Sequence, residues 1–163
     1  MSLRGILDKS LVVAAAVANS GKVYKHLVWS VDDSEITVAA LFVDAQARIN
    51  TIMFTRESTK SIDRGPNDNR DRHTIVGKWY RSANRAADAS SASEDSFQDD
   101  VEAMRTAFKN NRKLKDGNGV RQAIWCDPME ARLVAFVTFK GVLCNYAELV
   151  FVAEDGPFNT TSV

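Results

Sequence analysis

The chain has 163 residues, of which 45% are hydrophobic and 26% are charged, close to the averages for globular proteins. These values exclude a fully disordered chain, a collagen-like repeat and a coiled-coil rod, and the length fits one domain. The 21 basic and 21 acidic residues balance, so no net charge directs the protein toward nucleic acid or an anionic membrane.

The first predicted element is an amphipathic helix at the N-terminus. Leucines recur at helical spacing from Leu3 to Leu11, and Gly21 stands where a helix end favours glycine. Charged residues interrupt the pattern of a signal peptide and limit the apolar run to residues 11–18. That run is far shorter than the roughly 20 residues that span a bilayer. We therefore expect no membrane partner, and a location in the cytoplasm or within an assembled particle.

Three strands are predicted next, at residues 24–31, 35–44 and 48–56, because turn residues separate runs rich in β-branched and aromatic side chains. The middle of the chain, at about 57–95, is predicted to be a long insert that is mobile or contacts a partner. It contains loop residues such as Gly65 and Pro66 and ends in a Ser- and Ala-rich stretch typical of linkers.

A central helix is predicted to begin at Ser96, whose side chain suits an N-cap. Its apolar residues recur at i, i+4, i+7 and i+11, which places them on one helix face. These residues are Phe97, Val101, Met104 and Phe108.

Three further strands are predicted, at residues 120–126, 131–139 and 145–153. Short turns join consecutive strands, and strands joined in this way pair antiparallel. The sequence therefore predicts one α+β domain over residues 1–163, with about six antiparallel strands and an N-terminal and a central helix. The expected order after the first helix is β-β-β, long insert, helix, β-β-β.

Several of the predicted strands are apolar on both faces, unlike strands of a sheet that exposes one face to water. Either the sheet closes on itself as a barrel or sandwich, or its second face docks on other copies of the chain or on another protein. The candidate interface residues are Phe42, Val134, Phe136, Val150 and Val152. We expect a non-catalytic assembly protein that forms homo-oligomers, for which a component of a viral or phage particle is one setting.

The balanced charge conceals blocks of opposite sign. Residues 56–85 carry a net charge of +4, residues 88–102 of −6 and residues 105–121 of +5. Cations next to aromatic residues are typical of nucleic-acid surfaces, so a nucleic-acid-binding module is an alternative function. Its candidate residues are Arg64, Arg70, Arg72, Lys78, Trp79, Tyr80, Arg81 and Arg85.

A small enzyme that uses His73 or Cys126 is a further alternative. The sequence contains no glycine-rich phosphate loop and no close pair of zinc ligands, so it predicts no cofactor and no metal. Cys126 and Cys144 lie in neighbouring predicted strands, where they form either a disulfide or two buried thiols.

Overall fold

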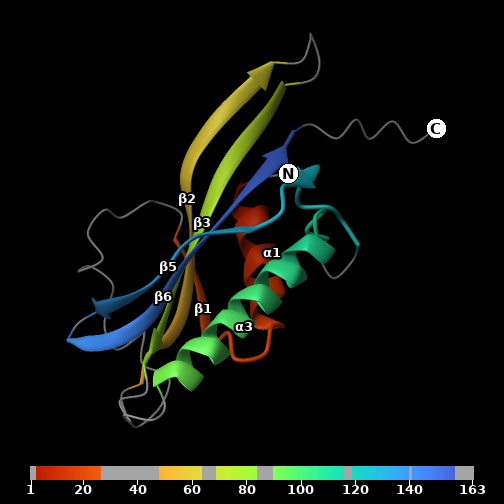
Figure 1. Ribbon diagram of the computed structural model, residues 1–163. Helices are drawn as coiled ribbons and strands as arrows, with labels where there is room; N and C mark the ends of the chain where they lie inside the picture. The colour runs from red at the N-terminus through yellow and green to blue at the C-terminus, as the bar shows by residue number, and fades with distance from the viewer. Residues whose placement is uncertain are drawn as a thin grey trace.

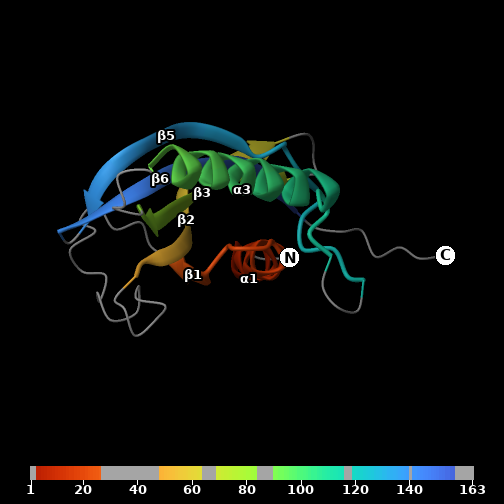
Figure 2. The same ribbon diagram turned by 60° about the horizontal axis from the view of Figure 1, so that its bottom comes forward.

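The computed structural model describes residues 3–26, 48–63, 69–83, 90–115, 119–139 and 141–156. Within these residues the protein has an α+β fold, in which six strands form one mixed sheet (Figure 1). The helices are α1 (Leu3–Ala15) and α3 (Ser90–Asn110). The strands are β1 (Lys22–His26), β2 (Asn50–Asp63), β3 (Asn69–Ser82), β4 (Trp125–Cys126), β5 (Glu130–Phe139) and β6 (Val142–Asp155). Figure 2 shows both helices on the same side of the sheet.

The sheet is mixed, so the prediction of purely antiparallel strands was wrong for one pair. The strand order is β1-β2-β3-β6, and β4 and β5 both pair with the remaining edge of β6. β1 runs parallel to β2, with Lys22 opposite Thr51, whereas every other pair is antiparallel. The chain between these two strands is long enough for the crossover that a parallel pair requires. Phe42 and the rest of residues 27–47 lie outside the described residues.

Most of the segment predicted as an insert is a long β-hairpin. β2 continues to Asp63 and β3 begins at Asn69, and the pair extends past the ends of β4 and β6 (Figure 1). The register shifts between Arg56 and Ser58, the signature of a β-bulge. Before this bulge β2 is buried on both faces, and after it β2 is mostly exposed. A strand that is solvated on both faces shows no apolar alternation, and for that reason the sequence pattern indicated a loop.

Helix α3 begins at Ser90 rather than at Ser96, so part of the predicted linker is helical. Alanine, serine and glutamate are all tolerated in helices, and the polar composition alone did not exclude this. The predicted apolar face is confirmed, because Phe97, Val101, Met104 and Phe108 are all buried. The predicted strand at 120–126 is reduced to β4, which contains only two residues.

The main core lies between the two helices and the sheet. The Phe97 ring lies 5.2 Å from the ring of Trp79 in an edge-on arrangement, and Phe108 lies 5.1 Å from Phe151. Gly77 leaves room for Phe54, since an added Cβ would lie 2.7 Å from the Phe54 ring. Aromatic contacts from the two ends of α3 therefore fix this helix on β2, β3 and β6.

A second apolar cluster lies on the opposite face of the sheet, near the β5–β6 end. Tyr80 is central to it, with ring centroids 4.6 Å from Phe139 and 4.9 Å from Tyr146. Farther along the same face the side chains are charged and form ion pairs, such as Arg72 with Glu154. Neither described helix is long and apolar enough to cross a membrane.

Candidate functional site

The structure does not bring the predicted nucleic-acid-binding residues to one surface. Successive residues of β3 face opposite sides of the sheet, as in any strand. Trp79 is 0% exposed in the main core and Tyr80 is 4% exposed in the second cluster. Neither aromatic ring is therefore open to stack on a base. Arg64 and Arg85 lie outside the described residues.

The remaining predicted cations occupy separate places. Arg70 and Arg72 both pair with Glu154, at 3.7 Å and 2.9 Å, on the face opposite the helices. Lys78 lies on that same face, opposite Glu148 of β6. The ion pairs of Arg70 and Arg72 neutralise part of the positive charge that the sequence concentrates between residues 56 and 85.

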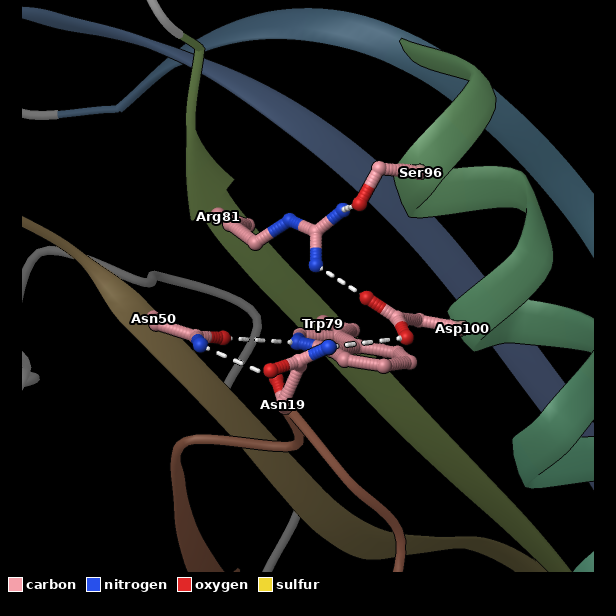
Figure 3. A network of polar contacts seen from close by, with 6 residues as sticks. All are labelled: Asn19, Asn50, Trp79, Arg81, Ser96 and Asp100. Carbon is pink, nitrogen blue, oxygen red and sulfur yellow. Dashed lines mark hydrogen bonds and ion pairs between the residues drawn. The ribbon is translucent and has the colours of Figure 1, made fainter. Parts of the chain in front are cut away.

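Arg81 belongs to a polar network beneath α3, shown in Figure 3. Its guanidinium forms an ion pair with Asp100 and lies 4.9 Å from the centre of the Phe97 ring. The side chains of Arg81 and Asp100 are only 15% and 12% exposed. A second guanidinium nitrogen lies 3.5 Å from the hydroxyl oxygen of Ser96.

The same network reaches the chain that follows α1. Asn19 donates a hydrogen bond of 3.3 Å to the second carboxylate oxygen of Asp100. Asn50 donates to the backbone carbonyl of Asn19 at 3.0 Å and accepts from the indole N–H of Trp79 at 3.1 Å. The network joins α3 to β2, β3 and the turn after α1 (Figure 3). Trp79 and Arg81 therefore hold the fold together.

A group of exposed large apolar side chains lies on β5 and at the start of β6. One edge of this strand pairs with β6, and no other strand of the described residues pairs with its second edge. Leu133 and Phe136 are each 48% exposed and lie on opposite faces of the strand. Leu143 is 41% exposed and is a diagonal neighbour of Phe136 across the β5–β6 pair. We call Leu133, Phe136 and Leu143 the β5 edge patch.

The predicted interface residues fall on two faces of the sheet. Phe136 belongs to the β5 edge patch, whereas Val134 is half-buried against the main core. Val150 and Val152 are half-buried on the face opposite the helices. The sequence alone could not show that Leu133 and Leu143 are exposed. Their strands are apolar on both faces, so no alternation marks an exposed side.

The exposed surface of α3 carries opposite charges at its two ends. The acidic side chains in the first part of the helix are Glu94, Asp95, Asp99 and Glu102, all exposed. The basic side chains at and beyond its C-terminal end include Lys109, Lys113 and Lys115, and they line a hollow of about 400 Å³. The helix dipole stabilises acidic side chains near the N-terminus of a helix and basic side chains near its C-terminus, so it favours this distribution of charge. It also gives the protein two complementary patches on one element.

Trp125 adds an aromatic ring beside this basic end. It is 40% exposed, and the Arg112 guanidinium lies 4.5 Å above its ring centre. Cation–π contact of this kind orients the arginine and keeps its charge near the surface.

His73 lies in a cluster of potential metal ligands. Its ring and the carboxylates of Asp71 and Asp155 offer three ligand atoms that lie within 4.8 Å of one another. The sequence pointed to His73 only as a residue that a small enzyme would use, because the strand that carries it was not recognised.

The two cysteines are free thiols, and both are buried. Cys126 faces the main core and Cys144 the second cluster, so the sheet separates them. Burial, together with the neighbouring Asp127 carboxylate and against the opposing effect of Arg112, raises the pKa of Cys126 from 9.0 to about 12. Burial also raises the pKa of Cys144 to about 11. A nucleophilic role requires a thiolate, and these environments disfavour it.

At neutral pH we expect Cys126 in the native protein to hold about a thousandfold less thiolate than in the unfolded chain, because its two pKa values differ by about 3. The measurement is the rate of modification by a thiol reagent, with the protein in urea as the control. Folding favours the protonated thiol, so stability is also expected to fall as the pH rises from 9 toward 12. Rapid labelling of the native protein would contradict the burial of these thiols.

No protein-family model and no curated protein matches the chain. The function must therefore be inferred from the structure, and three features of the described residues are candidates for a functional site. They are the β5 edge patch, the charge-sorted surface of α3, and the cluster of Asp71, His73 and Asp155.

Proposed function

We propose that the protein is a non-catalytic assembly subunit that binds copies of itself through the open edge of β5. The observation that carries this proposal is the β5 edge patch beside an unpaired strand edge of the described sheet. Natural proteins protect open edges with charge, bulges or short strands, because such edges pair with other chains. β5 carries a register shift and the charged Arg132 near its start, but from Leu133 to Phe139 it pairs regularly with β6 and exposes apolar side chains on both of its faces.

A strand from a second copy placed beside β5 would pair with the backbone edge that no described strand covers, and would bury Leu133 and Phe136. Strand addition draws its affinity from main-chain hydrogen bonds and its specificity from the side chains on alternate faces. The exposed leucine and phenylalanine supply apolar contacts on both sides of such a joint, so contact with a second copy removes both from water.

The charge pattern of α3 supports contacts between different surfaces of neighbouring copies. Its acidic first part on one subunit complements the basic end near Lys109 and Lys113 on the next. Contacts of this head-to-tail type generate rings when the rotation closes. A component of a viral or phage particle, built from repeated copies, is one setting that fits such a subunit.

The two alternative functions have less support. Nucleic-acid binding through residues 56–85 would need aromatic rings that stack on bases, but Trp79 and Tyr80 are buried. Catalysis by Cys126 would need a thiolate in a site that raises its pKa to about 12.

The test is the mass of the protein in solution by light scattering. We expect a multiple of the 18.0 kDa chain for the wild type, and weakening of association by at least about tenfold for Phe136→Asp. An introduced carboxylate at an apolar contact loses its hydration without gaining a partner. Leu133→Asp is expected to act in the same way.

The matched control is Val120→Asp, which alters an equally exposed apolar residue away from the β5 edge. This variant is expected to associate like the wild type. A wild type that stays monomeric at high concentration, or an effect of Val120→Asp as large as that of Phe136→Asp, would remove the basis of the proposal.

A further inference from the structure

We propose that Asp71, His73 and Asp155 bind a divalent transition-metal ion of the Zn²⁺ or Mn²⁺ type. The three side chains come from β3 and β6, which are neighbours in the sheet. They offer one imidazole nitrogen and two carboxylate oxygens, all within 4.8 Å of one another.

The register of the sheet creates the cluster. Asp71 of β3 lies directly opposite Asp155 of β6, and His73 follows two residues later on the same face. Like charges at directly opposed positions of neighbouring strands destabilise a sheet. A divalent cation between the two carboxylates would cancel this repulsion, so the arrangement is better suited to a cation than to solvent alone.

The imidazole of His73 supplies the second, independent observation. His73 is only 4% exposed, and its Nε2 forms no hydrogen bond of good geometry. This nitrogen lies 3.2 Å from a carboxylate oxygen of Asp155, a contact that is an ion pair only when the ring is protonated. Buried polar atoms without hydrogen bonds are rare, and each calls for an explanation such as a bound ion. A metal ion held between Nε2 and the carboxylates provides one.

The other ring nitrogen, Nδ1, contacts a neighbouring polar group, as is usual for a histidine that binds a metal through Nε2. Nδ1 of His73 lies 2.9 Å from the hydroxyl oxygen of Thr59 on β2. When Nδ1 donates its proton to that oxygen, the lone pair of Nε2 points toward the aspartates. Ser61, two residues further along β2, donates a hydrogen bond of 2.5 Å to Asp71. Both outer contacts orient ligands rather than occupy the metal position.

The ligand set selects the class of ion. Two carboxylates and a neutral imidazole carry a charge of −2, which matches a divalent cation. Imidazole suits zinc, iron, copper and nickel, carboxylates also suit manganese, and Mg²⁺ prefers oxygen alone. Ligands of a tetrahedral zinc ion lie about 3.4 Å apart, so small rotations of the two aspartates complete the site. Asp71 and Asp155 are half-buried, which leaves a path for the ion from solvent.

The position in the fold indicates a structural role. Beyond this cluster β2 and β3 pair through only two more residues each, whereas β6 ends at Asp155. An ion at this point would join the end of β6 to the β2–β3 hairpin, at the place where three paired strands become two.

The experiment measures the thermal unfolding of the full chain after treatment with EDTA, with Zn²⁺, Mn²⁺ or Mg²⁺ added back. An ion at a hundredfold excess over its Kd is expected to raise Tm by about 5–10 °C in a chain of this size. We expect this shift with Zn²⁺ or Mn²⁺ and little with Mg²⁺. His73→Gln and Asp155→Asn are both expected to abolish it.

The matched control is Asp127→Asn, which removes a carboxylate from the same end of the sheet but leaves the three ligands in place. This variant should keep the full shift. If His73→Gln fails to give a folded circular dichroism spectrum, Asp155→Asn decides, because that side chain is nearer the surface. No shift in the wild type, an equal shift with Mg²⁺, or shifts that persist in both ligand variants would overturn the proposal.

Discussion

Replacing Asp100 with alanine is expected to lower the free energy of unfolding by about 3 kcal/mol, at the lower end of the range for breaking a buried ion pair. The loss is large because the Arg81 guanidinium then stays beneath α3 without its counter-ion. Asn19 also loses its acceptor, so the contact between α3 and the turn after α1 is broken as well. Urea denaturation followed by far-UV circular dichroism measures the change.

The matched control is Glu102→Ala, which removes a carboxylate from the same helix that is paired only at the surface with Arg105. Exposed pairs contribute about 0–1 kcal/mol, so this variant should differ little from the wild type. In the double variant with Arg81→Met, the cost of Asp100→Ala should shrink, because no buried cation is left unpaired. Equal losses for Asp100→Ala and Glu102→Ala would show that the network of Figure 3 does not stabilise the fold.

Replacing Gly21 with alanine is expected to cost about 3 kcal/mol, from two effects that add. Gly21 has a φ of +70°, where a side chain costs about 1–2 kcal/mol. An added Cβ would also overlap the backbone carbonyl oxygen of Asn50, and overpacking of this kind costs about 1–3 kcal/mol. Any shift of Asn50 would disturb its bonds to Asn19 and Trp79.

Gly119→Ala separates the two effects. Gly119 has a φ of +79°, but among the described residues, its chain neighbours aside, no atom lies within 4 Å of the position that a Cβ would take. Its replacement should therefore cost only the backbone term of about 1–2 kcal/mol. Thermal unfolding of both variants gives the comparison. If Gly21→Ala is no more destabilising than Gly119→Ala, the close approach of Gly21 to Asn50 does not contribute to the free energy of unfolding that the substitution costs.

The sequence was most informative where one face of an element is buried. The spacing of Phe97, Val101, Met104 and Phe108 predicted which side of α3 faces the core, and all four are buried. β5 and β6 were located to within a few residues, because their apolar runs are bounded by turn residues. In these elements the pattern and the burial have the same physical cause.

The long hairpin and the parallel pair could not be read in the same way. The outer part of β2 has no buried face and therefore no period, so its polar residues were attributed to a loop. The partner of β1 depends on where a long connection returns, which no local pattern encodes. Trp79 and Tyr80 were assigned to a nucleic-acid surface because adjacent aromatic residues in a basic segment look exposed. β3 is covered on both faces at this point, and both rings are buried.

The candidate sites were predictable only in part. Phe136 was identified as an interface residue and is exposed on the edge strand. The cluster around His73 was missed, because Asp155 reaches it through the pairing of β3 with β6 and not through spacing along the chain. The one available signal was the pattern Asp71-x-His73, which puts both side chains on one face if the segment is a strand.

The central position of β6 has a consequence for the synthesis of the protein. β6 pairs with β3, β4 and β5, yet it is the last of the described strands to leave the ribosome. Until then the inner edge of β3 lacks its neighbour, and the apolar face of α3 lacks Leu149 and Phe151. Contacts between such distant parts of the chain form slowly, and unpaired strand edges expose nascent chains to aggregation. The described sheet is therefore completed by its last strand, and the surfaces that β6 covers stay exposed for most of the translation of the chain.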